Sequence, residues 1–471
     1  MKKTLERIEK MAGQYKVRKG TGGKIRVWIG CILIAVSLIG LAVVGGQLLM
    51  RQTEDGTQME NQSTASTTPS SSVPVSEPST KPAITKLHSA TIGVSGDILL
   101  HNRLIQSGYD KETDTYDYDN VFSVFSQFVS QVDYAVANME GTLCGEDNGY
   151  PYSGYPCFNA PDAIVDAAKN AGFDMLLTAN NHSFDTGIKG FMRTQEVIKD
   201  RNLDYIGTRY TQEDKNYIVK TINNINVGMI NYTYNTGFNE NGNASLNYIP
   251  LTAEATALVN TFSYDDLDGF YAKLSEELEA MQSDGAEVVM LYIHWGDEYH
   301  TEANATQKEM AQALCNMGID VIVGNHAHVP QPVELLTNTN DESQKTLCLY
   351  STGNLLSNIR RGESYPAETE DGMLFQVTFV KYSDGTVLLE KAKVIPTWVN
   401  RYSQAGKTVF EILAMDDESN WQGNGEMSAE LLNSYRESYD RTMNIVGSGL
   451  ETANQYYAQN QADTETNLGI A

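Results

Sequence analysis

The sequence predicts an α/β protein in which one layered domain follows a single transmembrane helix and a flexible stalk. Two observations support this prediction. Strand-like and helix-like segments alternate between residues 88 and 399, which is the pattern of an α/β layered domain. Ahead of that region, residues 28–50 form an uncharged apolar run that is long enough to cross a bilayer as a helix.

The composition allows a large folded core and argues against nucleic-acid binding. The chain has 471 residues, of which 41% are hydrophobic, so it has room for one large domain or for two to three smaller ones. Its formal net charge is −26, whereas nucleic-acid binding depends on Lys and Arg side chains that contact phosphate. We therefore expect no nucleic-acid partner.

The first 51 residues predict a membrane anchor. Residues 1–26 are basic, and residues 27–51 contain the apolar run from Trp28 to Met50, closed by Arg51. By the positive-inside rule, the basic segment stays in the cytoplasm and the main domain lies outside the cell membrane. A cleaved signal peptide is the alternative, but its apolar region spans only about 7–15 residues. The length of this run favours an uncleaved anchor.

A linker and a tail are predicted on either side of the main domain. Residues 52–87 are rich in Ser, Thr, Gln and Pro, a composition that cannot bury a core and predicts a disordered linker. Residues 401–471 are acidic and polar, with one or two helices expected between residues 427 and 457. We assign no chemistry to this tail.

Between residues 88 and 400 the pattern predicts eight strands and four helices. The predicted strands are residues 90–95, 134–137, 175–178, 227–230, 288–293, 321–323, 346–350 and 374–380. The predicted helices are residues 162–171, 190–201, 264–283 and 305–317. Short polar turns between the last strands predict antiparallel pairing there.

Side chains that bind divalent metal ions follow five of these strands. The strand ends are Gly96-Asp97, Asn138-Met139-Glu140, Asn180-Asn181-His182 with Asp185, His294-Trp295-Gly296 with Glu298, and Gly324-Asn325-His326-Ala327-His328. Carboxylate, amide and imidazole groups are ligands for ions such as Mn²⁺, Zn²⁺ or Fe. In α/β folds, ligands bind beyond the carboxyl ends of the strands. The strand ends therefore predict one metal centre, and two ions about 3.5–4 Å apart can activate water against a phosphoester.

The order of these motifs resembles the CapA family, which belongs to the calcineurin-like metallophosphoesterase superfamily and is linked to poly-γ-glutamate capsule synthesis. The resemblance runs from about Thr91 to Asn354 through Gly-Asp, Asn-x-Glu, Asn-Asn-His-x-x-Asp-x-Gly, His-Trp-Gly-x-Glu, Gly-x-His-x-His-x-x-Gln and Ser-x-Gly-Asn. It implies two mixed β-sheets packed as a sandwich and flanked by helices, as in metallo-dependent phosphatases. It also implies a role in making or exporting an anionic surface polymer.

The resemblance implies roles for individual residues as well. The implied ligands of one or two divalent ions (Mn, Zn, Fe or Mg) are Asp97, Glu140 as the bridging carboxylate, Asn181, His294, His326 and His328. His182 would contact the phosphoryl or leaving group, and Asp185 would orient His182. The implied substrate-binding residues are Asn138, Trp295, Glu298, Gln331, Ser351 and Asn354.

The sequence departs from the superfamily pattern at one position. The first motif there is Asp-x-His, and Leu99 stands in place of the histidine. His101 follows nearby, and we expect it at the surface rather than among the ligands. Cys144 and Cys157 pair in an oxidising compartment or stay free, because sequence does not fix connectivity.

Two classes of function remain open. In the first, the domain is a metal-dependent hydrolase that acts on a phosphoester or on an amide bond of the polymer, or a general cell-surface phosphoesterase. In the second, it binds the polymer without catalysis, as an assembly subunit of a membrane synthase or export complex, with Arg360 and Arg361 as a local patch for the polyanion. The absent histidine favours the second class, and the retained ligands favour the first.

Overall fold

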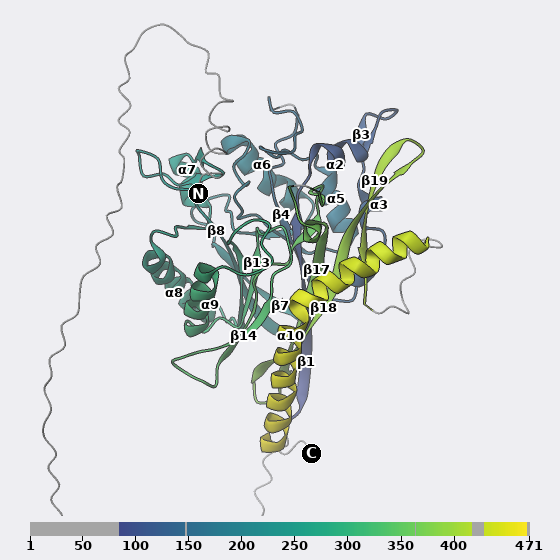
Figure 1. Cartoon of the computed structure of the whole chain (residues 1–471). Coiled ribbons are helices and arrows are strands. Elements are labelled where there is room, and N and C mark those ends of the chain that lie inside the picture. The colour runs from purple at the N-terminus through teal and green to yellow at the C-terminus, as the bar shows by residue number, and fades with distance from the viewer. Residues whose placement is uncertain (1–83, 147, 363, 417–427, 469–471) are drawn as a thin grey trace, which may run out of the picture. The chain divides into compact units, whose positions relative to one another are not determined.

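The computed structural model describes residues 84–146, 148–362, 364–416 and 428–468 (Figure 1). All of them belong to the compact unit Pro78–Ala471. The predicted cytoplasmic segment, the predicted transmembrane helix and residues 52–83 of the predicted linker lie outside the described residues. Within the described part, no helix is both long and apolar enough to cross a membrane.

The first sheet has eight strands in the order β19-β18-β17-β1-β4-β5-β6, with β16 beside β1. Its strands are β1 (Lys86–Ile98), β4 (Tyr134–Met139), β5 (Met175–Leu177), β6 (Asp204–Ile206), β16 (Asn354–Leu356), β17 (Asp371–Tyr382), β18 (Val387–Gln404) and β19 (Lys407–Ala414). Strands β1, β4, β5 and β6 run parallel, and β17, β18 and β19 pair antiparallel, as their short polar turns predict.

The second sheet has seven strands in the order β11-β8-β12-β13-β15-β14, with β7 beside β8. Its strands are β7 (Tyr217–Ile222), β8 (Ile225–Tyr234), β11 (Thr261–Phe262), β12 (Val288–His294), β13 (Val321–Asn325), β14 (Val333–Thr337) and β15 (Lys345–Leu349). Strands β8, β12, β13 and β15 are parallel neighbours. All seven residues of β12 are buried, which explains its unbroken apolar run, because helices and a second sheet cover both faces of such strands.

The two sheets pack face to face around a shared core. Val136 of β4 lies in one hydrophobic cluster with Met229 of β8 and Tyr292 of β12. The alternate residues Leu291 and Ile293 of β12 belong to another cluster, as the period of two in a strand requires. The α/β fold with mixed sheets is therefore confirmed.

Helices cover the outer faces of the sandwich. On the second sheet these are α8 (Leu267–Ser283) and α9 (Ala305–Asn316), which lie side by side in Figure 1. On the first sheet, α5 (Ala163–Asn170) and α6 (Gly187–Asp200) supply side chains to the outer cluster. The remaining short elements are α2 (Asn102–Ser107), β2 (Tyr109–Asp110), β3 (Thr115–Tyr116), α3 (Asp119–Phe122), α4 (Ser126–Val129), β9 (Ser245–Leu246), β10 (Ile249–Pro250), α7 (Ala253–Leu258) and the 3₁₀ helix Ala367–Glu370.

The domain boundaries predicted at residues 88 and 400 are wrong. Strand β1 already begins at Lys86, and β18 runs through residue 400 to Gln404. Strand β19 then extends the same sheet to Ala414. Strand β19 contains the apolar residues Val409, Phe410, Ile412 and Leu413, and the sequence pattern missed it because the tail around this short run is acidic and polar.

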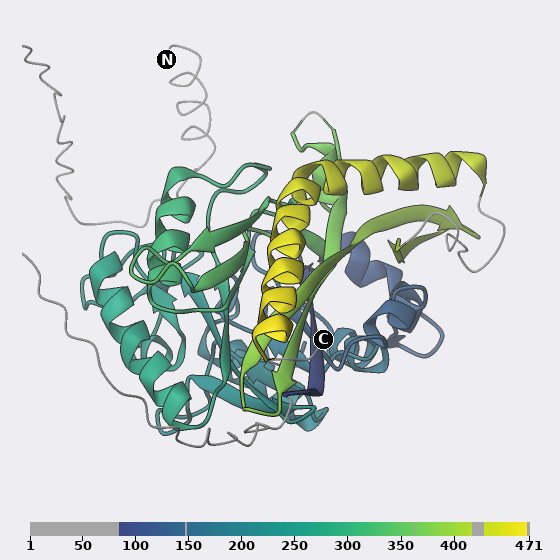
Figure 2. The same ribbon diagram turned by 90° about the horizontal axis from the view of Figure 1, so that it is seen from below.

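The rest of the predicted tail is one 40-residue helix, α10 (Ala429–Leu468), which Figure 2 shows bent into two arms. The triplet Gly447-Ser448-Gly449 lies at its middle, and such small residues permit a sharp bend. A Cβ at Gly449 would lie 1.7 Å from the carbonyl oxygen of Val333 in β14. Val446 and Ala453 join the core between the sheets, so α10 is part of the domain.

A buried ion pair fixes the first arm of α10. Arg441 donates to both carboxylate oxygens of Asp371 at 2.7 Å, and Ser438 donates to the same carboxylate at 2.6 Å. Asp371 begins β17 and is fully buried. Removing one partner of a buried ion pair leaves an uncompensated charge, which costs more than the pair itself contributes.

We therefore expect Arg441→Met to lower the free energy of unfolding of the domain by about 3 kcal/mol. Urea titration of the fragment 78–471 measures this loss. The double variant Asp371→Asn/Arg441→Met should recover part of the stability, because it removes the unpaired charge. A loss below about 1 kcal/mol in the single variant would contradict this account of the pair.

Candidate metal centre

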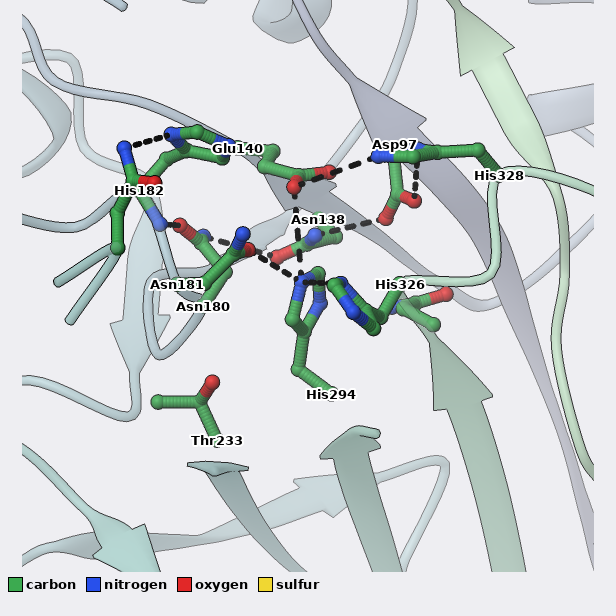
Figure 3. A network of polar contacts seen from close by, with 12 residues as sticks. Asp97, Asn138, Glu140, Asn180, Asn181, His182, Thr233, His294, His326 and His328 are labelled. Atoms are coloured by element: carbon green, nitrogen blue, oxygen red, sulfur yellow. Dashed lines mark hydrogen bonds and ion pairs between the residues drawn. The ribbon is translucent and has the colours of Figure 1, made fainter. Parts of the chain in front are cut away.

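The predicted ligand residues lie together at the carboxyl ends of strands from both sheets (Figure 3). Asp97 lies near the end of β1 and Glu140 follows β4 in the first sheet, while His294 ends β12 in the second sheet. His326 and His328 follow β13. All five side chains are buried, and Figure 3 shows them pointing toward one another.

These side chains form two overlapping groups. Glu140, His294 and His326 make the first, and Asp97, Glu140 and His328 make the second; the ligand atoms of each group lie within 4.8 Å of one another. Glu140 belongs to both groups, which is the position expected of a bridging carboxylate. The Oδ1 atom of Asn181 lies 2.8 Å from Nε2 of His294 and adds an amide oxygen to the first group.

The donor set fits divalent cations. In the described part of the chain, Oδ2 of Asp97 and both carboxylate oxygens of Glu140 are buried without a hydrogen-bond partner. Their nearest partners are imidazole nitrogens of His294 and His328, at 3.3–3.8 Å. Burying carboxylates with so few partners is costly, and a divalent ion held by the same side chains would offset that cost. Carboxylate, amide and imidazole donors together suit several divalent metals, so the geometry predicts the charge of the ion and leaves its identity open.

Proximity and burial shift the protonation of these groups strongly. Burial, and then the charge of Glu140, raise the pKa of Asp97. Burial also lowers the pKa of His326, and its histidine neighbours lower it further. For His328, burial opposes the charged form, but Glu140 and Asp97 outweigh it and raise the pKa to about 10. Metal ions displace protons from such groups, so metal affinity here depends on pH.

The turn after β13 is strained in a way that aims the two imidazoles. His326 has φ 93° and His328 has φ 56°, a region that non-glycine residues seldom occupy. Such backbone strain is concentrated at functional sites, where the surrounding structure enforces it. Asn354 enforces it here: its Nδ2 donates to the carbonyl of His328, and its Oδ1 lies 3.0 Å from Nδ1 of His328.

Neighbouring amides hold the carboxylate ligands. Asn138 donates from Nδ2 to Oδ1 of Asp97 at 2.8 Å, which leaves Oδ2 for an ion. Asn180 donates to the carbonyl of Met139 at 2.8 Å, next to Glu140. Asn138 and Asn354 therefore position ligand residues, and neither lines the cavity beside the centre. Outer contacts of this kind orient ligands and tune the metal.

His182 and Asp185 form a hydrogen-bonded pair beside the metal centre. Nδ1 of His182 lies 2.7 Å from Oδ2 of Asp185, and this oxygen also accepts from the backbone N–H of Phe158. Burial alone would lower the pKa of His182, but Asp185 outweighs it and raises the pKa. With Nδ1 directed at Asp185, Nε2 remains for a substrate.

A cavity of about 600 Å³ opens at the centre and is lined by His182, His326, His328 and Asn181 together with aromatic side chains. Of the predicted substrate-binding residues, Glu298 alone lines it. His101 also lines it, in contrast to the predicted surface position, and its ring lies 5.3 Å from that of Phe158. Burial lowers the pKa of His101 to about 4. His101 lies outside both ligand groups.

Three further residues that were predicted to contact substrate do not line this cavity. Trp295 is fully buried and donates from Nε1 to the carbonyl of Tyr350; it follows His294 directly, and successive side chains of a strand point to opposite faces. Gln331 is fully buried and donates to the carbonyl of His300. Ser351 is buried and accepts from the backbone N–H of Gly353.

The structure also shows the surroundings of the two predicted basic residues and of the two cysteines. Arg360 and Arg361 both pair with Glu370, and neither lines the cavity. Contact of this pair with a polyanion elsewhere on the surface stays a prediction. Cys144 and Cys157 are free thiols.

Two residues of the site were missed. Tyr234 places its hydroxyl 3.2 Å from Nε2 of His326. Its neighbour Thr233 is in register with His294 across the parallel pair β8–β12, so the end of β8 should have been counted with the other strand ends. Asn247 places Nδ2 3.3 Å from Nδ1 of His182; it reaches the site from the β9–β10 hairpin, for which the local sequence carries no signal.

Comparisons with known proteins agree with the motif order. The family described as "Bacterial capsule synthesis protein PGA_cap" matches residues 91–359, more than half of the chain. The PGA biosynthesis protein CapA of Bacillus subtilis (strain 168) is 25% identical over 332 residues, which cover 69% of this chain and 78% of that protein. The capsule biosynthesis protein CapA of Bacillus anthracis is 27% identical over 269 residues, 56% of this chain and 59% of the relative.

Among solved structures, a protein from Staphylococcus aureus named as a candidate 5′-nucleotidase, in complex with α-ketoglutarate, matches with a TM-score of 0.39 at 14% identity. The match covers 74% of this chain and 58% of that one.

Proposed function

The chain belongs to the bacterial capsule synthesis protein PGA_cap family, and from that premise we propose that its domain is a metal-dependent hydrolase acting on a phosphoester. The reaction would serve the synthesis of a capsule, of poly-γ-glutamate or of a related anionic surface polymer. The observation that carries the proposal is the pair of ligand groups that share Glu140 beside the His182–Asp185 pair. Divalent ions, when bound there, would activate water and neutralise phosphoryl charge.

The residues of the chain divide the remaining work. In the hydrolysis, the oxygen of water forms a bond to phosphorus, and the bond from phosphorus to the leaving oxygen breaks. The water loses one proton to solvent, and solvent later returns one to His182. Nε2 of His182 gives its proton to the leaving oxygen, because Nδ1 is occupied by Asp185. Asp185 fixes the orientation of the imidazole and stabilises its charged form.

The test combines metal analysis of the purified full chain with assays on an aryl phosphate ester and on a γ-glutamyl oligomer. Metal-dependent release of phosphate supports the proposal. Cleavage of the oligomer alone would replace the phosphoester with an amide bond. Stoichiometric metal without hydrolysis of either probe would overturn it.

A second candidate is an assembly subunit of a membrane synthase or export complex with a structural metal. The observation in its favour is the second ligand group, which offers three protein ligands, Asp97, Glu140 and His328. The superfamily pattern has a histidine as the fourth ligand, and in this chain the buried residue Leu99 stands at that position.

We also propose that residues 27–51 anchor the chain in the cell membrane, with the domain outside. The support is the uncharged run after a basic segment, which the positive-inside rule orients in this way. The chain should stay in the membrane fraction after an alkaline wash, and protease added to intact cells should remove the domain. Recovery of a soluble mature form that begins near residue 50 would show a cleaved signal peptide instead.

A further inference from the structure

We propose that Tyr155 and Tyr248 form a subsite for a ring in the leaving group, so that the substrate is a sugar phosphate or a nucleoside phosphate rather than a polyanionic chain. The inference rests on the proposed hydrolase function and names the class of its substrate. Both kinds of ester share the chemistry that the subsite requires, a ring with a weakly polar face bonded to one phosphoryl group.

The charges around the cavity oppose a polyanion. Among the residues that the structure describes, no lysine or arginine lines it, and Glu298 adds a negative charge. Anionic ligands are usually held by Arg or Lys side chains. One phosphoryl group is accommodated by the metal centre and its imidazoles, whereas every further carboxylate of a γ-glutamyl chain would lie against a lining that offers no lysine or arginine. The remainder of the ligand is therefore uncharged.

Two exposed tyrosines stand over the same cavity. Tyr155 is 76% exposed and Tyr248 is 83% exposed, and both line the cavity. They are the two most exposed large apolar side chains in the described part of the chain. Aromatic side chains gain most by stacking on another ring, and stacking on a base is worth roughly 5- to 150-fold in affinity.

The backbone at Tyr248 has a conformation that a bulky residue seldom adopts. Asn247 has φ 48° and Tyr248 has φ 60°, the two positive values of a type I′ turn, at the tip of the β9–β10 hairpin. Glycine is the usual second residue of such a turn, and positive φ is unusual for a bulky residue. The backbone N–H of Tyr248 donates to Oγ1 of Thr236 at 2.9 Å. An exposed ring thus occupies a position where glycine would be easier to fold.

The same turn connects the tyrosines to the reacting group. Nδ2 of Asn247 donates to Oδ1 of Asp185 at 3.1 Å and to the carbonyl of Pro156 at 3.0 Å. Pro156 follows Tyr155, so one amide links both tyrosine segments to the partner of His182. Because His182 serves the leaving oxygen in the proposed reaction, the ring over the cavity belongs to the leaving group.

The test compares kcat/KM of the full chain for glucose 1-phosphate, adenosine 5′-monophosphate and glycerol 3-phosphate, the last of which lacks a ring. At least one ring-bearing ester should exceed glycerol 3-phosphate by about tenfold or more. Tyr248→Gly should erase this preference by raising KM for the ring-bearing esters. The value of kcat/KM for glycerol 3-phosphate, which has no ring to stack, should stay within about twofold of the wild-type value. Glycine suits the positive φ, so the melting temperature should not fall. The two ring-bearing substrates distinguish a sugar from a nucleoside.

Matched variants sharpen the result. Tyr248→Phe should keep the preference, because it keeps the ring. Tyr210→Ala is the control, since Tyr210 is also exposed but contacts Glu196 outside the cavity. Equal loss on all three esters, no preference for a ring, or faster turnover of a γ-glutamyl oligomer would overturn the subsite while leaving a hydrolase.

Failure of the proposed function itself has a different signature. If the metal-loaded chain hydrolyses no ester, calorimetric titration with adenosine and with N-acetylglucosamine still reports the subsite. Binding of one of them, weakened by Tyr248→Gly, supports the inference without catalysis. Absence of binding by both would overturn it.

Discussion

Glu140→Gln should lower the divalent metal content of the purified chain by at least half and its phosphoesterase rate by about 10³-fold. Glu140 is the one carboxylate that both ligand groups share, so a neutral amide there weakens both. Bound ions supply several kcal/mol of transition-state stabilisation, and each 1.36 kcal/mol is a factor of ten in rate. Metal content is measured by plasma mass spectrometry after dialysis, and the rate with an aryl phosphate.

The matched control is Glu298→Gln, which makes the same chemical change at a carboxylate that lines the neighbouring cavity and belongs to neither ligand group. It should keep wild-type metal content. A chelator should lower the melting temperature of the wild type, because an ion that binds only the folded state adds about 2.7 kcal/mol of stability at 100 times its Kd. In Glu140→Gln the chelator should have little effect. Wild-type metal content in Glu140→Gln would contradict the assignment of Glu140 as the bridging ligand.

His182→Ala should leave the metals bound and still lower turnover by about 10²–10⁴-fold, the usual range for a positioned proton donor. His182 pairs with Asp185 and lines the cavity, but it belongs to neither ligand group. The measurements are metal content, kcat on an aryl phosphate, and the yield of surface polymer in cells that carry the variant.

His101→Asn is the control for His182→Ala, because it removes another imidazole from the same cavity. The fold-loss of kcat in His101→Asn should be at least about ten times smaller than the fold-loss in His182→Ala. Normal polymer yield with His182→Ala, together with retained metal, would exclude catalysis through this residue. That result would favour the assembly subunit over the hydrolase.

The metal centre was largely predictable because local patterns and one topological rule were sufficient. The apolar run Val321–Val323 predicts a buried strand, and His326 and His328 follow its carboxyl end. Parallel neighbours bring such ends to one edge, so Asp97, Glu140 and His294 follow. The rule places a residue at an edge of the sheet and does not decide which way its side chain points, so Trp295, Gln331 and Ser351 were grouped with the site although they do not line the cavity.

Other parts depend on contacts that no local pattern carries. Strand β19 and helix α10 were grouped as a polar tail, because the acidic and polar composition of residues 401–471 masks the short apolar run in β19 and the apolar stripe of α10. The first arm of α10 is held by Asp371, 70 residues away in sequence from Arg441. Asn247 likewise reaches Asp185 across 62 residues. Such long-range pairs are visible only once the fold has brought the segments together.

The ligand groups draw on both halves of the sandwich, from Asp97 in the first sheet to His328 after the second sheet's β13. Chains are made from the N-terminus, so Asp97 and Glu140 exist long before the last imidazole is synthesised. Ion capture with the full set of ligands thus cannot precede the joining of the sheets, and metal binding is coupled to that event. Metal occupancy would therefore mark complete folding, because a chain that stops before residue 294 offers only Asp97, Glu140 and Asn181 of the six ligand residues.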